Sequence, residues 1–318
     1  MERRQLGASE LMVSRLALGT MTFGWTADET ESFRILDAYV EAGGNFLDTA
    51  DIYSRWARGN TGGESETVIG QWLKDRGRRD GLVIATKVRG RMWPGPTGEG
   101  LGREHIRRAC EQSLKRLGIE TIDLYQCHWP DEGVPFDETL RAFEDLIRHG
   151  KVRYIGLSNY SPVQLRAALA VAGRDGLPGI VSLQPHYNLV HRDTAADPFE
   201  GELQDLCVAQ GIGVIPYSPL AKGLLTGRYT AQTVKKASRS GIGEYLHGKT
   251  WAVVDAVRAV AAAYDTSMAA VALAWLMEQP AVIAPIVGAR TVEQLREQLP
   301  AAGLTLGADA LQRLSAAG

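Results

Sequence analysis

Four side chains suited to acid–base chemistry end or closely follow apolar runs. Asp48 ends one run, Tyr53 lies five residues later, Lys87 ends a second run and His128 follows a third. A buried carboxylate is costly without a cation, so we expect Asp48 to pair with Lys87. A neighbouring ammonium stabilises a phenolate and so lowers the pKa of the phenol. The residues predict the start of a proton-donating site in which Tyr53 is the donor and the Asp48–Lys87 pair tunes it.

The runs that carry these residues are strand-like and recur along the whole chain. They lie at 15–19, 45–48, 82–87, 121–127, 152–157, 180–184, 212–216 and 282–287. Helical spacing separates them and places Phe33, Leu36 and Val40 on one face of 29–42. Further helices are predicted at 103–117, 136–149 and 250–263. Ser161 with Gln164 predicts a capping box at the start of another.

Strands that alternate with helices indicate a parallel sheet, because parallel strands need long crossover connections. Continuous apolar runs indicate that both faces of each strand are covered. Eight such units favour an α/β fold of the (β/α)8 TIM-barrel type over a doubly wound open sheet. Residues 3–14 predict an N-terminal β-hairpin that caps one end. No linker or charge block divides the chain, so residues 1–318 are predicted to form one domain.

Composition excludes several function classes. A net charge of −2 over 318 residues argues against nucleic-acid binding driven by phosphate neutralisation. No apolar run approaches the roughly 20 residues needed to span a bilayer, and the N-terminus lacks a signal-peptide pattern. The three cysteines form no CxxC pair. These features predict a cytoplasmic protein without structural zinc.

Polar residues also end or follow the later strands. They are Ser158 and Asn159, Gln184, Tyr217 and Ser218, and Gly288 with Arg290. The carboxyl ends of barrel strands form the face on which active sites lie, and the longest insertion, 218–248, belongs to that face. Seven successive strands that end in polar groups are difficult to explain as solvated loop tips.

One nucleotide-binding motif is treated as a chance match. GEYLHGKT at 243–250 fits the P-loop pattern, but the basic, polar residues before it are not strand-like. No GxGxxG follows a strand either, so a Rossmann site is not expected.

The sequence resembles the aldo-keto reductase family along nearly its whole length. The matching pieces are LALGTMTFG (16–24), NFLDTADIY (45–53), ATKV (85–88), HWPD (128–131), KVRYIGLSNY (151–160), the glutamine of SLQPHYNL (182–189), IPYSPLAKGLL (215–225) and IVGARTVEQLREQL (286–299). The resemblance is closest to the branch of bacterial short-C-terminus reductases and potassium-channel β-subunits. It implies a catalytic tetrad of Asp48, Tyr53, Lys87 and His128, and an NADPH/NADP+ cofactor that lies extended across the barrel mouth.

The resemblance also implies the residues that contact this cofactor. Ser158, Asn159 and Gln184 would contact the carboxamide, and Tyr217 would stack on the nicotinamide. Ser218, Leu220 and Gly223 would line the pyrophosphate, and Arg228, Arg239 and Arg290 are candidates for the 2′-phosphate. The remaining implied contacts are Thr20, Met21, Asp48, Pro219, Gly288, Gln294 and Gln298. Gln298 stands where the family usually has an asparagine that faces adenine.

Aromatic residues on the predicted loops suggest the substrate class. Trp25, Trp56, Trp93 and Trp129, together with Tyr53, predict an apolar slot for an aromatic or bulky carbonyl compound. The sequence leaves open which carbonyl is used, the physiological direction, and whether the chain forms a homo-oligomer.

Two other functions remain as alternatives. In the first, which the resemblance to channel β-subunits allows, the chain is a nucleotide-binding regulatory subunit with residual reductase activity. In the second, it is a barrel enzyme that catalyses metal-assisted hydrolysis. The second lacks ligands, because the six histidines show no HxH or HExxH spacing. No metal site is predicted.

Overall fold

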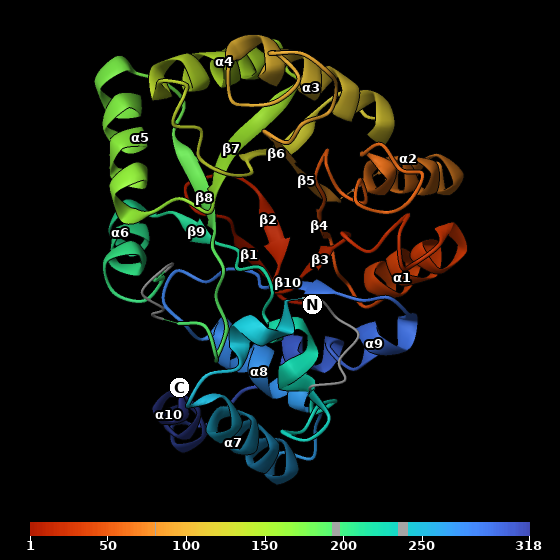
Figure 1. The fold of residues 1–318 in the computed structure, drawn as a ribbon, viewed down its shortest axis with the longest axis vertical. Coiled ribbons are helices and arrows are strands. Elements are labelled where there is room, and N and C mark those ends of the chain that lie inside the picture. Colours follow the sequence, from red (N-terminus) through yellow and green to blue (C-terminus); the bar gives the residue numbers. More distant parts are fainter. Residues whose placement is uncertain (80, 193–197, 235–240) are drawn as a thin grey trace.

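The computed structural model describes residues 1–79, 81–192, 198–234 and 241–318. Within these ranges the main sheet contains eight parallel strands in the order β10-β3-β4-β5-β6-β7-β8-β9. Their bounds are β3 Ala17–Gly19, β4 Phe46–Asp48, β5 Val83–Val88, β6 Ile122–Cys127, β7 Val152–Ser158, β8 Ile180–Gln184, β9 Gly213–Val214 and β10 Ile286–Gly288. This confirms the predicted parallel α/β architecture, with the sheet curved and helices around it (Figure 1).

The segment before β10 closes the barrel. The predicted eighth strand, 282–287, is divided between two neighbours. Its first part pairs with β9, because the Val214 N–H donates to Ala281 O at 2.8 Å and the Ile283 N–H donates to Val214 O at 2.8 Å. Its second part pairs with β3, where Ile286 lies opposite Ala17. Hydrogen bonds therefore continue from the last strand to the first.

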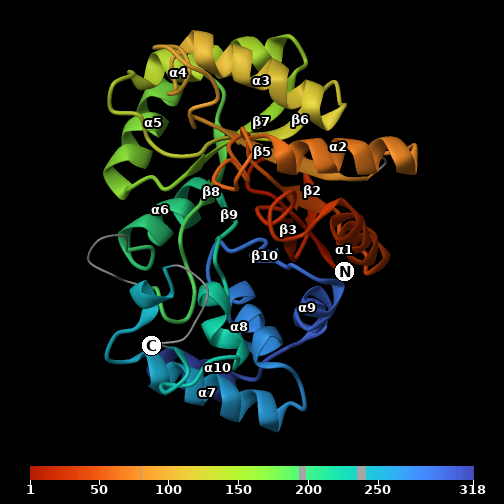
Figure 2. The same cartoon turned by 45° about the vertical axis from the view of Figure 1, so that its right-hand side comes forward.

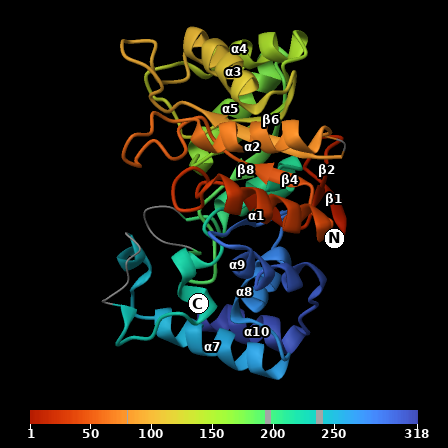
Figure 3. The ribbon, with the colours of Figure 1, turned by 90° about the vertical axis from the view of Figure 1, so that its right-hand side faces the viewer.

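An antiparallel hairpin of β1 (Arg3–Gln5) and β2 (Met12–Ser14) precedes the barrel, as predicted. Its apolar side chains Leu6, Leu11 and Val13 join a buried cluster with Phe46 and Leu124 inside the barrel. The hairpin lies beside the chain's N-terminus, and long loops project from the other side of the molecule (Figure 3). It therefore leaves the carboxyl ends of the strands available for a site.

The helices surround the strands (Figures 1 and 2). They are α1 Glu29–Glu41, α2 Glu64–Arg76, α3 Arg103–Leu117, α4 Phe136–Arg148, α5 Pro162–Asp175, α6 Glu202–Gln210, α7 Thr250–Ala263, α8 Met268–Met277, α9 Val292–Arg296 and α10 Ala308–Ala317, with shorter 3-10 turns η1 Ala221–Thr226, η3 Ile242–Tyr245 and η4 Leu299–Gly303. The capping box predicted at Ser161 and Gln164 is present at the start of α5.

The buried face of α1 overlaps the expected one, since Leu36 is buried and Phe33 and Val40 pack against the core, but it is centred on other residues. Ile35, Leu36 and Tyr39 are buried, whereas Phe33 and Val40 are only partly buried. The reason is the Tyr39 hydroxyl, which donates to Leu16 O at 2.7 Å and so turns that face of the helix toward the sheet. Apolar spacing alone did not register this polar anchor.

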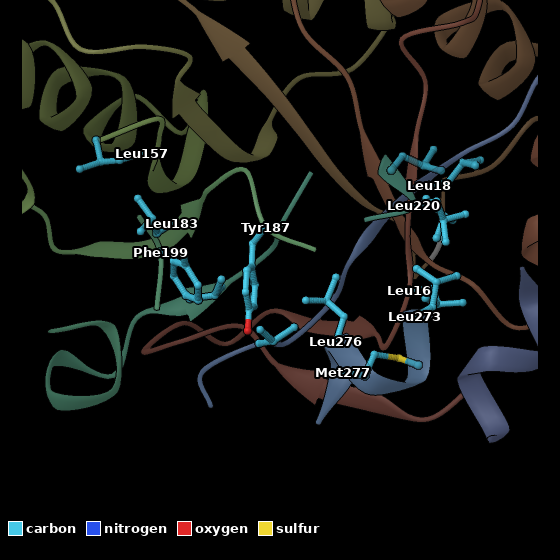
Figure 4. Close-up of a cluster of buried hydrophobic side chains, with 14 of the residues drawn as sticks. Leu16, Leu18, Leu157, Leu183, Tyr187, Phe199, Leu220, Leu273, Leu276 and Met277 are labelled. Atoms are coloured by element: carbon cyan, nitrogen blue, oxygen red, sulfur yellow. The ribbon is translucent and has the colours of Figure 1, made fainter. Parts of the chain in front are cut away.

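A second core lies between the outer surface of the barrel and the helices. Leu18 of β3 and Leu16, just before it, lie with Leu273, Leu276 and Met277 of α8 in the close-up of this cluster (Figure 4). In the described ranges no single helix is long and apolar enough to cross a bilayer. The pair α7 and α8 meets that test only in combination, bent by 101°.

Replacing Ser161 by alanine tests the α5 cap. We expect the free energy of unfolding to fall by about 1 kcal/mol, because the Gln164 N–H loses its side-chain acceptor. Urea denaturation measures this difference. Val163→Ala is the control, because Val163 lies in the same turn at 73% exposure and should leave the midpoint unchanged. Equal midpoints for both variants would contradict the role of the cap.

Candidate active site

The strand register places the predicted acid and base side by side. Asp48 is the last residue of β4 and pairs with Ala85 of β5, two residues before Lys87. Lys87 pairs in turn with Gln126 of β6, and His128 follows two residues later. Tyr53 lies in the turn that follows β4. Three consecutive strands thus bring the four residues to the same end of the barrel.

The Lys87 ammonium is the centre of this group. Its Nζ lies 2.6 Å from Asp48 Oδ2, 2.8 Å from Thr49 O and 2.9 Å from Tyr53 Oη. The Lys87 side chain is fully buried. Because an ammonium has three N–H donors, all three are used by these contacts. Tyr53 Oη therefore accepts from Lys87 and keeps its own proton to donate elsewhere.

Two glutamines hold the other oxygen of Asp48. Gln184 Nε2 donates to Asp48 Oδ1 at 3.0 Å, and Gln126 Nε2 donates to it at 3.2 Å. Gln184 also donates to Gln126 Oε1 at 3.1 Å. The structure thus brings Gln184, predicted as a carboxamide contact, to the acid of the tetrad.

Gln126 was missed in the sequence, although a signal was present. It lies two positions before His128, so both face the same side of β6. A polar residue on the same face of the strand as His128 is informative for this reason, even though β6 also carries Asp123. Its full burial and its bond to Asp48 make it a positioning residue for the carboxylate.

Burial dominates the acidity of the phenol. Burial raises the pKa of Tyr53 above its ordinary value, although the Lys87 cation acts to lower it. The net direction therefore differs from the lowering expected from the lysine alone. Burial also acts to lower the pKa of Lys87, but Asp48 and Tyr53 favour the cation and raise that pKa overall. At neutral pH the site holds a protonated phenol beside an ammonium.

His128 is a neutral ring at the edge of the site. Burial, followed by the cations Lys87 and Arg89, holds the pKa of His128 well below its ordinary value of 6.5. Its ring centroid lies 5.9 Å from that of Tyr53, edge-on. Its Nδ1 is buried and has no hydrogen-bond partner among the described residues. A neutral imidazole of this kind can donate one hydrogen bond to a carbonyl oxygen.

Three of the four predicted pocket tryptophans continue this set of rings. Trp25 meets Trp56 edge-on at 5.6 Å, Trp56 meets Tyr53 at 6.3 Å, and Trp129 stacks on His128 at 3.7 Å. Each is more than a third exposed. Together with the tyrosine and the histidine they form an apolar wall beside the acid group.

Trp93 has different neighbours. Its ring lies 4.8 Å from that of His105, and the Arg108 guanidinium lies 4.2 Å above it. These contacts fix the loop at 89–102 against α3. The structure therefore links Trp93 to the support of a loop rather than to the set of rings beside Tyr53.

The residues predicted to contact the nicotinamide end form one hydrogen-bonded group. The Tyr217 hydroxyl donates to Asn159 Oδ1 at 2.9 Å, and Asn159 Nδ2 donates to His128 O at 2.9 Å. The Ser158 hydroxyl donates to Gln184 O at 2.9 Å. Thr20 is buried, and its hydroxyl donates to Asp48 O at 3.1 Å. Met21, by contrast, is 40% exposed, at the rim.

The predicted pyrophosphate segment has a strained backbone. Ser218, Ala221 and Lys222 have φ values of 52°, 47° and 53°, and Gly223 has a φ of 97°. Pro219 and Leu220 between them are buried. Positive φ at non-glycine residues costs of the order of 1–3 kcal/mol each and is characteristic of ligand clamps. The positive φ values of this turn fit a phosphate-binding segment.

The residues predicted for the adenosine end differ in exposure. Arg228 is exposed and Arg290 is partly buried, whereas Arg239 lies outside the described residues. The Arg290 N–H donates to Gln294 Oε1 at 3.1 Å. Gln298 is buried, and its Nε2 donates to the carbonyl of Gly288 at 3.1 Å and to that of Gln294 at 2.8 Å. Gln298 Oε1 is buried without a partner among the described residues.

Three other features were considered as binding sites: the P-loop-like segment, a metal site and a surface groove. The P-loop-like segment runs from within the 3-10 turn η3 to the first residue of α7, and it buries Tyr245 completely. Within the described ranges, no three His, Cys, Asp or Glu side chains are placed to hold a metal ion. A basic groove of about 780 Å³ lies between α2 and α3, lined by Lys74, Arg78 and Lys115, and contains none of the tetrad.

Comparison with known proteins agrees with this geometry. The model of the Aldo/keto reductase family matches residues 15–318. The "Uncharacterized oxidoreductase YrpG" of Bacillus subtilis is 40% identical, over 99% of this chain and 95% of its own length. A "Probable voltage-gated potassium channel subunit beta" of Oryza sativa is 36% identical, over 95% of this chain and 91% of its own. An "L-glyceraldehyde 3-phosphate reductase" of Escherichia coli O157:H7 is 33% identical, over 95% and 87%.

A match of the family model to nearly the whole chain, and full-length relatives above 30% identity, place the resemblance in every part of the barrel. The chain therefore belongs to the aldo/keto reductase family of oxidoreductases.

Proposed function

We propose that this protein reduces an aldehyde or ketone to an alcohol with NADPH as the hydride donor. The observation that carries the proposal is the Lys87 ammonium, whose three donors are divided among Asp48, Thr49 O and Tyr53. Carbonyl reduction requires a hydride on carbon and a proton on oxygen. NADPH, when bound, supplies the hydride.

The proton comes from Tyr53. Its oxygen already accepts from Lys87, so its O–H is directed to a carbonyl oxygen in the pocket. The phenolate that remains is stabilised by the adjacent ammonium, and Asp48 keeps that ammonium charged. The neutral His128 donates a second hydrogen bond to the same oxygen and orients it.

The residues of this chain also fit the cofactor. Tyr217, Ser158 and Asn159 would hold the nicotinamide end, and the strained segment 218–223 would hold the pyrophosphate. Guanidinium groups bind phosphate in a bidentate way, so Arg290 and Arg228 would favour NADPH over NADH. Arg239, outside the described residues, belongs to the same proposal.

The substrate is a small carbonyl compound with an apolar body. The wall of Trp25, Trp56 and Trp129 beside Tyr53 favours an aromatic or bulky group over a small polar one. A cytoplasmic location, absence of nucleic-acid binding, one domain over 1–318 and a possible homo-oligomer remain predictions.

A second candidate follows from the channel-related sequences. A chain 36% identical to a probable potassium-channel β-subunit is a candidate regulatory subunit that binds nucleotide and reduces carbonyls slowly. The reductase is favoured here because all four residues of the proton-donating group are present. A panel of aldehydes and ketones separates the two. Turnover below about one per minute with every compound would favour the subunit, because enzymes typically turn over about once per second or faster.

Replacing Tyr53 by phenylalanine should abolish proton donation and leave the cofactor bound. We expect turnover to fall by about 10²- to 10⁴-fold, the usual contribution of a general acid, with the Kd for NADPH within about twofold of the wild type. Steady-state kinetics and fluorescence titration measure the two quantities. Tyr154→Phe is the control, because Tyr154 reaches the N-terminal hairpin through the Glu10 N–H. Unchanged turnover of Tyr53→Phe would remove the central assignment.

The pH dependence follows from the two shifted groups. The pKa of Tyr53 is raised from 10.0, and that of His128 is lowered well below 6.5. Neither group changes charge between about pH 7 and about pH 9. We therefore expect a constant single-turnover rate of NADPH oxidation in this range, and a decline only as Tyr53 loses its proton at higher pH. A tenfold change inside the range would contradict the assigned protonation states.

Arg290 tests the choice of cofactor. Arg290→Ala should raise the Kd for NADPH by about tenfold or more, through loss of a charge-assisted hydrogen bond to the 2′-phosphate. The Kd for NADH, which lacks this phosphate, serves as the internal control and should not change. Arg34→Ala is a control variant, because Arg34 pairs with Glu31 on the surface of α1. A parallel loss of NADH affinity would assign Arg290 to the structure of the loop instead.

A further inference from the structure

His186 supports the ring that the proposed function assigns to the nicotinamide. It follows β8, and its ring stacks on Tyr217 with centroids 5.0 Å apart and planes within 11°. Tyr217 is fixed at its other end by the bond from its hydroxyl to Asn159. A nicotinamide stacked on Tyr217 would therefore rest on two successive rings.

The same imidazole also contacts the insertion after β9. His186 Nε2 lies 2.7 Å from the hydroxyl of Tyr245, which is fully buried in η3. The rings of these two residues meet edge-on at 5.5 Å. Stacking on His191 at 3.8 Å further fixes the plane of His186. The imidazole thus touches both the proposed nicotinamide platform and the long loop.

Tyr245 in turn reaches the strained segment 218–223. Burial, followed by the charge of Glu244, raises the pKa of Tyr245. Lys222 Nζ pairs with Glu244 Oε1 at 2.9 Å and lies 5.9 Å from the Tyr245 ring centroid. The carbonyl of Ser218 accepts from Asn188 Nδ2 at 2.9 Å. Within the strained turn, Ser218 is therefore held by Asn188, which follows β8, and Lys222 is held by Glu244, the residue before Tyr245.

We propose that His186 is a positioning residue that, through Tyr245, couples the segment 218–223 to the orientation of Tyr217. This inference rests on the proposed function. The hydrogen bond between His186 and Tyr245 would fix the nicotinamide side of the site, at Tyr217, relative to the pyrophosphate side, at 218–223. A cofactor that engages both segments gains from their fixed relation, since less conformational freedom is lost on binding. A ligand that lacks the nicotinamide gains little from it.

Two substitutions remove the link without removing a ring. Tyr245→Phe deletes the hydroxyl, and His186→Phe keeps the stack on Tyr217 but deletes the nitrogen. We expect each to speed NADPH dissociation by about fivefold, the effect of losing one buried hydrogen bond. The double variant should match the singles rather than multiply them, because both changes remove the same contact. Stopped-flow displacement of NADPH, followed by its fluorescence, measures these rates.

A cofactor fragment separates positioning from general loosening. The probe is 2′,5′-ADP, which lacks the nicotinamide, and its Kd should remain within about twofold of wild type in both variants. Tyr187→Phe is the matched control. It deletes the Tyr187 hydroxyl, which donates to Glu200 at 2.6 Å, and keeps the ring that packs against Phe199 and Trp275. It should leave NADPH dissociation unchanged.

Each outcome decides the proposal. NADPH dissociation at the wild-type rate in Tyr245→Phe or His186→Phe, or an equal loss of affinity for 2′,5′-ADP, overturns the link. If one variant fails to fold, the other still decides, since each removes one side of the same bond. Failure of the wild type to bind NADPH would overturn the proposed function itself, and would be seen before any variant is compared.

Discussion

The buried ammonium of Lys87 is the constraint on which the site depends. A cation out of water is tolerated only when its donors are satisfied and its charge is balanced. Asp48, Thr49 O and Tyr53 meet both needs at 2.6–2.9 Å. Two glutamines then satisfy the other oxygen of Asp48. The barrel can bury this group because adjacent parallel strands deliver each partner in register.

Burial acts on the phenol in a direction opposite to the lysine. A surface tyrosine beside an ammonium would be acidified, whereas Tyr53 has a raised pKa because desolvation is the larger effect. A phenol that holds its proton suits a donor that must release it only when charge develops on a carbonyl oxygen. Burial also keeps His128 uncharged, so the two groups that the proposed function assigns to the carbonyl oxygen are both neutral.

The rest of the fold divides support from recognition. The hairpin fills one end of the barrel with Leu6, Leu11 and Val13, so the other end can remain polar. Among the described residues, positive φ values at non-glycine positions occur in the turn at 218–223 and at single loop residues such as Asn159. Backbone strain persists where surrounding contacts fix the conformation, and the hydrogen bonds of Tyr245 and Asn188 are such contacts beside this turn.

Local sequence determined much of the protein. Apolar runs and helical spacing predicted the strand–helix alternation and most of its bounds, because both patterns report burial residue by residue. Residue types at strand ends predicted the tetrad's place. Four features came only from the tertiary structure. They are the division of the eighth strand between β9 and β3, the anchoring of α1 by Tyr39, the separation of Trp93 from the other rings, and the hydrogen bond from Gln126 to Asp48. Each depends on contacts between residues far apart in the chain, and desolvation, which sets the pKa of Tyr53, exists only once those contacts have excluded water.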